Sequence, residues 1–145
     1  MSKIEDFLTT VQEQEIIKAI EVAENNTSGE IRVHIENNTD LPPMERALEV
    51  FHLLEMEKTE LRNGILFYVA VESKKFAILG DEGIHTKVTD NFWDAEKELM
   101  LSYFKKEEFA LGLVLAITEV GNKLKEFFPY QSNDADELSN EISKG

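Results

Sequence analysis

The order of apolar and polar positions along the chain predicts alternating helices and strands. Residues 10–24 have apolar side chains at helical spacing, and a capping box that starts at Thr10 begins this helix. The turn-forming residues 25–29 end it. In residues 30–36 apolar and polar side chains alternate strictly, which is typical of a strand that buries one face.

The middle of the chain predicts a second helix and a hairpin. Residues 44–54 carry an apolar stripe at helical spacing, with Asp40 as the expected cap. Residues 65–71 are continuously apolar, as in a central strand that is buried on both faces. The short connection 72–74 then leads to a returning strand at residues 75–79.

The last third of the chain predicts two helices and a polar tail. After the glycine-flanked acidic loop 80–83, Thr89 or Asp90 is expected to cap a helix, and the final helix runs from about Glu107 to just before Pro129. We divide the chain into a domain over residues 1–130 and an acidic tail over residues 131–145. Because the tail has few apolar anchors, we expect an extended or mobile arm.

The connections between these elements predict an α/β fold. Two strands joined by a helix lie parallel in one sheet, whereas a hairpin makes the next strand antiparallel. The expected architecture is therefore a small mixed β-sheet flanked by helices, in two or three layers.

Composition narrows the class of partner. Among 145 residues there are 29 acidic and 15 basic side chains, so the formal net charge is −14. This balance repels phosphate backbones, and nucleic acid is not an expected partner. The chain has no cysteine, which excludes a thiol nucleophile and cysteine-ligated metals. The apolar runs are much shorter than the ~20 residues that span a bilayer, so we expect no membrane insertion and a cytoplasmic location.

The predicted topology gathers carboxylates at one end of the sheet. Glu30 opens the first strand, Asn63 precedes the second, and Asp81 follows the third, which runs the opposite way. Asp90 comes shortly after Asp81, and Glu107 and Glu108 open the last helix. Clustered carboxylates repel one another unless they are protonated or bridged by a cation, and oxygen ligands suit Ca²⁺ or Mg²⁺. Ordinary solvated charges and helix-start carboxylates are the alternative interpretation.

Common catalytic signatures do not occur in the sequence. There is no HExxH motif, no G-x-S-x-G elbow and no phosphate-binding glycine loop. The three histidines lie far apart in sequence, and we expect surface or half-buried positions for them. Residues 134–145 begin like a calcium loop but lack its glycine and its final glutamate.

Several short motifs, taken in order, resemble the TPM domain family. They are Ser28-Gly29-Glu30-Ile31-Arg32-Val33, Asn63-Gly64-Ile65-Leu66, Ala77-Ile78-Leu79-Gly80-Asp81-Glu82-Gly83-Ile84, Val88-Thr89-Asp90 and the run from Phe104 to Leu113. The resemblance covers about residues 10–128. It implies an α/β/α sandwich that binds a divalent metal, usually calcium, in an acidic groove. The metal ligands that the resemblance implies are Glu30, Asp81, Asp90 and Glu108.

Three functions follow as hypotheses. The first is a non-catalytic module that binds Ca²⁺, with Mg²⁺ as an alternative ion, and that acts as a monomer, alone or on another protein. The second, implied only by the resemblance to plant relatives, is a metal-dependent acid phosphatase. The third is an adaptor that uses its tail or the polar face of the first strand, formed by Glu30, Arg32, His34 and Glu36.

Overall fold

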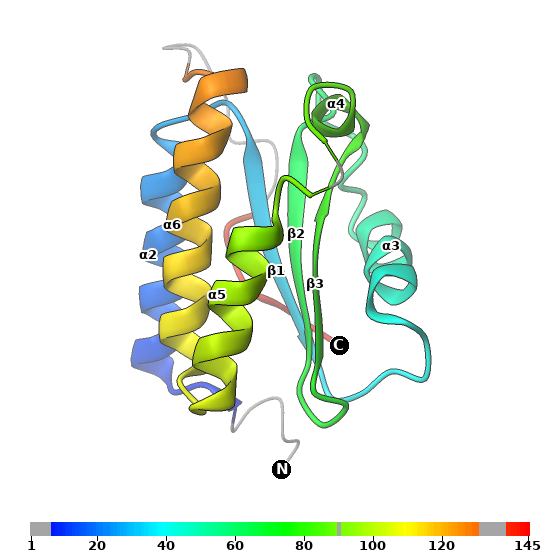
Figure 1. The fold of residues 1–145 in the computed structure, drawn as a ribbon, viewed down its shortest axis with the longest axis vertical. Coiled ribbons are helices and arrows are strands. Elements are labelled where there is room, and N and C mark those ends of the chain that lie inside the picture. Colours follow the sequence, from blue (N-terminus) through cyan, green and yellow to red (C-terminus); the bar gives the residue numbers. More distant parts are fainter. Residues whose placement is uncertain (1–6, 90, 131–138) are drawn as a thin grey trace.

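The computed structural model describes residues 7–89, 91–130 and 139–145. Within them the chain forms five helices and a four-stranded open sheet (Figure 1). The strand order is β3-β2-β1-β4. The elements, in chain order, are α2 (Thr10–Glu24), β1 (Glu30–Glu36), α3 (Pro43–Leu53), β2 (Gly64–Ala70), β3 (Lys75–Gly80), α4 (Glu82–His85), α5 (Asp94–Lys105), α6 (Phe109–Phe127) and β4 (Ser143–Lys144).

The sheet is mixed, as the sequence predicts. β1 pairs in parallel with β2, with Glu30 opposite Gly64, and β2 pairs with β3 as an antiparallel hairpin. Every residue of β2 is buried, because helices cover both faces of the sheet at this strand. The prediction of a central strand buried on both sides is therefore confirmed.

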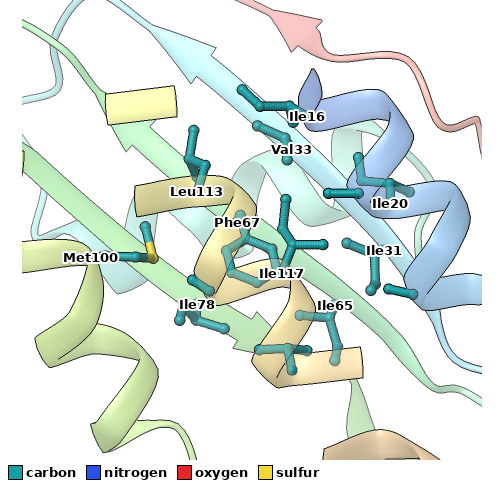
Figure 2. Packing of buried hydrophobic residues seen from close by; sticks show 14 of the residues in the cluster. Ile16, Ile20, Ile31, Val33, Ile65, Phe67, Ile78, Met100, Leu113 and Ile117 are labelled. Carbon is teal, nitrogen blue, oxygen red and sulfur yellow. The ribbon is translucent and has the colours of Figure 1, made fainter. Parts of the chain in front are cut away.

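The larger hydrophobic core lies between the sheet and the layer formed by α2, α5 and α6 (Figures 1 and 2). The apolar face of β1 meets buried side chains from the first and last helices there. α2 and α6 approach closely at Gly121, where a Cβ atom would lie only 2.7 Å from the Cβ of Ala23. The fully buried residues of this core include Ile16, Ile20, Ile31, Val33, Ile65, Phe67, Ile78, Met100, Leu113 and Ile117.

A smaller core lies on the other face of the sheet, under α3. It contains Ala47, Val50, Phe51, Met56, Leu66, Tyr68, Ala70 and Ala77. With helices on both sides of the sheet, the architecture is a three-layer α/β/α sandwich, which confirms the α/β class.

The tail is more closely tied to the domain than the sequence indicates. Ser143 and Lys144 form β4, which pairs in parallel with His34 and Ile35 of β1. The backbone amide of Gly145 also donates to the Ile35 carbonyl, at 3.0 Å. Residues 143–145 are thus docked on the sheet, so this part of the tail is not a free arm. The calcium-loop-like segment considered above lies partly outside the described residues.

Four helix starts differ from the sequence prediction. The capping box uses Thr9 rather than Thr10, since the Thr9 hydroxyl accepts from the Gln12 amide and the Gln12 side chain accepts from the Thr9 amide. α3 begins at Pro43, without a side-chain cap from Asp40. The acidic loop 80–83 contains the start of the short helix α4, capped by Asp81. α5 starts only at Asp94 and buries Glu96 and Met100.

Candidate functional site

The end of the sheet at α4 contains part of the predicted acidic cluster. Glu30 pairs with Gly64, and the Asp81 amide donates to the Gly64 carbonyl at 2.9 Å. The predicted grouping of Glu30, Asn63 and Asp81 at one end is therefore confirmed. Extended by one residue past Gly80, where β3 ends, the register places Asp81 beside Gly64, so Glu30 and Asp81 share a face of the sheet and lie two strand spacings apart, or roughly 10 Å.

Asp81 is already bound by protein donors in this structure. Its two carboxylate oxygens accept from Nε and Nη2 of Arg62, at 2.8 and 3.0 Å. The Glu82 backbone amide donates to the same carboxylate at 2.7 Å and caps α4. The Asp81 side chain is 5% exposed, whereas that of Arg62 is 42% exposed. A buried carboxylate is thus neutralised by a guanidinium that water can reach.

Arg62 lies among several carboxylates. Hydrogen bonding to Asp81 is the main cause of its raised pKa, and the charges of Asp81, Glu82 and Glu57 act in the same direction. Arg62 also has a φ of 51°, in the left-handed region that side chains other than glycine seldom adopt. Three carboxylates therefore act on Arg62, whose guanidinium is hydrogen-bonded to Asp81.

The other proposed metal ligands do not join Asp81. Glu30 is buried, at 4% exposed, and the width of β2 separates it from Asp81. Glu108 is exposed and precedes α6, at the opposite end of the sheet from α4 (Figure 1). Asp90 lies outside the described residues. Within those residues, no group of three or more His, Cys, Asp or Glu side chains is placed to hold a metal ion. The described side chains thus offer a partial set of ligands at Asp81 and no complete metal site.

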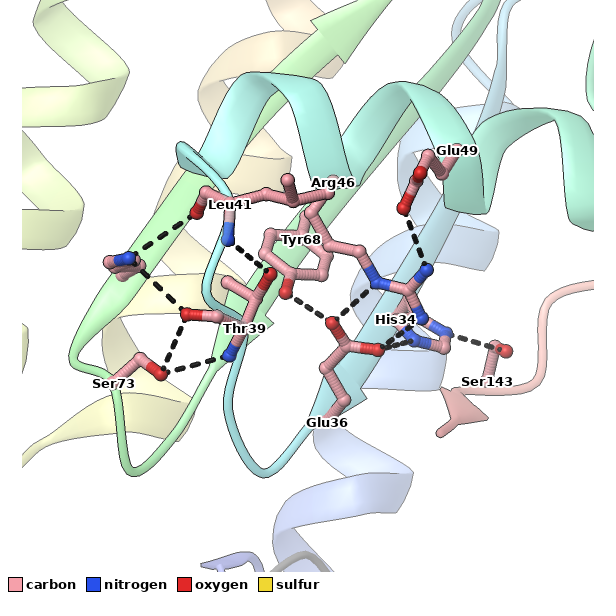
Figure 3. Close-up of polar contacts among 10 residues, drawn as sticks. His34, Glu36, Thr39, Leu41, Arg46, Glu49, Tyr68, Ser73 and Ser143 are labelled. Carbon is pink, nitrogen blue, oxygen red and sulfur yellow. Dashed lines mark hydrogen bonds and ion pairs between the residues drawn. The ribbon is translucent and has the colours of Figure 1, made fainter.

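A second polar cluster lies at the far end of β1, centred on the carboxylate of Glu36 (Figure 3). Arg46 of α3 donates to both of its oxygens, with N–O distances of 2.9 Å. The Tyr68 hydroxyl and Nε2 of His34 also contact this carboxylate. Nδ1 of His34 lies 2.9 Å from the Ser143 hydroxyl, so the cluster extends to β4.

The electrostatics of the Glu36 cluster follow from this geometry. Burial opposes the ionisation of Glu36, but hydrogen bonds from Arg46, Tyr68 and His34 outweigh it and lower its pKa to about 2. Burial raises the pKa of the Tyr68 hydroxyl, and its contact with Glu36 raises it further. Burial also lowers the pKa of His34, although Glu36 opposes this change. At neutral pH the cluster is an ion pair between the buried Glu36 and the partly exposed Arg46, beside a neutral imidazole.

Sequence reasoning missed this cluster. The polar face of β1 was expected to be available to a partner, and His34 was expected to be at or near the surface. In the structure Glu30, His34 and Glu36 are each at most 6% exposed. The available signal was a strand face of four polar residues opposite Tyr68, a hydroxyl within an otherwise apolar strand.

Comparison with known proteins identifies the family. A model of the TPM domain matches residues 2–123. The chain belongs to the TPM domain family. The TPM fold is also that of the BA42 protein from the psychrophilic bacterium Bizionia argentinensis, which is 50% identical over 100% of both chains, with a TM-score of 0.92.

Two more distant structures share the fold alone. The N-terminal domain of a protein from P. gingivalis matches 88% of this TPM domain protein and 83% of its own chain, with 15% identity and a TM-score of 0.71. The N-terminal domain of the cg2496 protein from Corynebacterium glutamicum has 15% identity over 95% of this chain and 80% of its own, with a TM-score of 0.63. No curated protein matches this chain. None of the described helices is both long and apolar enough to cross a membrane.

Proposed function

We propose that this TPM domain is a monomeric, non-catalytic binding or regulatory module that takes up a divalent cation, calcium or magnesium, in exchange for Arg62 at Asp81. The observation that carries the proposal is the ion pair between a buried carboxylate and an exposed guanidinium. The proposed location is the cytoplasm, and another protein is the proposed recipient of any regulatory effect.

Charge balance supports an exchange at this position. Removal of Arg62 alone would leave Asp81 buried and unneutralised, which is costly. A divalent cation would restore the balance, and the exposed carboxylate of Glu82, 3.5 Å from Nη1 of Arg62, is close enough to take part. Because the Arg62 side chain is 42% exposed, its guanidinium can rotate into solvent at a small cost in free energy.

The test is a titration of metal-stripped protein with CaCl₂ and with MgCl₂, followed by backbone amide chemical shifts. We expect saturable shifts around residues 62–64 and 80–83. Asp81→Asn should abolish them, and Arg62→Gln should tighten binding because the competing cation is gone.

Lys58→Gln is the matched control, since it also removes one positive charge but from an exposed pair with Glu55. Equal effects of Arg62→Gln and Lys58→Gln would indicate general electrostatics and contradict the exchange. A titration with no saturable shift would contradict the cation site itself.

The acid phosphatase hypothesis has no supporting contact among the described residues. It is tested by hydrolysis of p-nitrophenyl phosphate between pH 5 and pH 7, with and without added metal. A metal-dependent rate that is lost in Asp81→Asn would replace the non-catalytic proposal with an enzymatic one.

A further inference from the structure

A hollow of about 440 Å³ opens at the end of the sheet that is opposite Asp81. It lies between the β2–β3 hairpin, the last turns of α5 and the start of α6. This volume is within the range of small-molecule sites, roughly 300–1,000 Å³. The lining residues are Phe7, Val69, Ala70, Val71, Lys74, Lys75, Phe76, Leu101, Phe104, Lys105, Glu107 and Phe109.

Four phenylalanines form a continuous wall of the hollow. The ring centroids of Phe7 and Phe109 are 4.6 Å apart, those of Phe109 and Phe104 are 5.3 Å apart, and those of Phe104 and Phe76 are 5.4 Å apart. All four rings are only partly buried, and the neighbouring Leu101 is 44% exposed. The wall is therefore apolar surface that side chains of the described residues leave uncovered.

The charges around this wall favour an anion. Lys74 in the hairpin and Lys105 at the end of α5 are both exposed, and neither forms an ion pair with another described residue. Lys75 is not available to bind an anion, since its ammonium donates to the carbonyls of Thr39 and Leu41 at 3.3 Å. Glu107 is the one acidic residue of the lining. The lining thus carries a positive excess on a chain whose net charge is −14.

We propose that this hollow is a binding site for a free medium-chain carboxylate, with its apolar tail on the phenylalanine wall and its head group between Lys74 and Lys105. An apolar wall alone would bind any apolar molecule. Lys74 and Lys105 make the site selective for a molecule with an anionic end. A single medium-length chain fits within about 440 Å³, and the two lysines give its charged end a place at the rim, so we commit to this occupant. This site goes beyond the cation exchange proposed at Asp81 and does not depend on it.

The test is a titration with octanoate, decanoate and dodecanoate, each below its micelle concentration, followed by backbone amide shifts. We expect saturable shifts at residues 69–76 and 101–109, with those near Asp81 unchanged. Each buried methylene contributes about 0.8 kcal/mol, so affinity should rise about fourfold per added carbon until the hollow is full.

Matched ligands and variants test the two parts of the site. Decanol and decyltrimethylammonium have the same tail without the negative charge, and we expect at least tenfold weaker binding. Lys74→Gln and Lys105→Gln should weaken decanoate binding, whereas Lys106→Gln, which removes a charge outside the lining, should not. Leu101→Gln should weaken all tails, and because Leu101 is exposed we expect this variant to fold.

Several outcomes would overturn the proposal. One is equal affinity for decanoate and decyltrimethylammonium, which would reduce the site to a non-specific apolar patch. Another is the absence of saturable shifts at residues 69–76 and 101–109. A third, seen by extending the decanoate titration above its micelle concentration, is binding only in that range, which would indicate a lipid surface rather than a free carboxylate.

Discussion

The buried carboxylate of Glu36 gives the most direct quantitative prediction, through Glu36→Gln. Glutamine keeps the size of the side chain but loses the charge that pairs with Arg46. The lowering of the Glu36 pKa from 4.5 to about 2 corresponds to about 3 kcal/mol in favour of the folded state at neutral pH. Because the Arg46 side chain is 28% exposed and can turn into water, we expect a loss of about 2 kcal/mol.

The pH dependence of this loss follows from the sign of the change. A carboxyl group whose pKa is lower in the folded state stabilises the fold above its unfolded-state pKa. That contribution decreases as the pH falls from about 4.5 towards 2. We therefore expect the full effect of Glu36→Gln at pH 7 and less than half of it at pH 3.

The assay is urea unfolding followed by far-ultraviolet circular dichroism, with wild type and variant compared at both pH values. Glu49→Gln is the matched control, because Glu49 also pairs with Arg46 but its side chain is 55% exposed. We expect that control to change the free energy of unfolding by less than about 0.5 kcal/mol. Equal losses in the two variants, or a Glu36→Gln loss that is the same at pH 3 and pH 7, would refute the reasoning.

Two further predictions concern packing and the tail. Gly121→Ala should destabilise the protein by about 1–3 kcal/mol, because its Cβ would meet Ala23 at 2.7 Å; thermal unfolding measures this, and a gain in stability, the usual effect of alanine inside a helix, would contradict it. Deletion of residues 139–145 should raise the pKa of His34, which burial now lowers. The imidazole proton resonances report that titration, and an unchanged His34 pKa would mean that β4 does not bury this side chain.

Periodicity was enough to predict most of the fold. The apolar stripes of α2, α3 and α6 and the alternation of β1 each involve neighbours in sequence, and a buried face leaves a local pattern. The parallel pairing of β1 and β2 then followed from the helix between them. Helix starts were less predictable. Thr9 and Thr10 both have a hydroxyl that can accept a hydrogen bond from a first-turn amide, so the sequence does not decide which of them is the N-cap.

Contacts between distant segments could not be predicted in the same way. Nothing local in residues 139–145 indicates that Ser143 contacts His34, and the polar face of β1 gives the same pattern whether it meets water or a buried ion pair. The metal ligands show the same limit. Glu30 and Asp81 were correctly placed at one end by strand direction, but the position of Glu108 depends on how far α5 extends before α6 begins, which spacing alone does not give.

The docking of β4 has a consequence for how the protein is made. β1 is completed on one side by β2, but its other neighbour follows His34 by 109 residues. At a synthesis rate of roughly 5–20 residues per second, that interval lasts roughly 5–20 s. During this time the N–H and C=O groups on that edge of β1 have no strand beside them, and such edges pair readily with other chains. The nascent chain therefore keeps this stretch of the β1 edge, at His34 and Ile35, unpaired until β4 has been made.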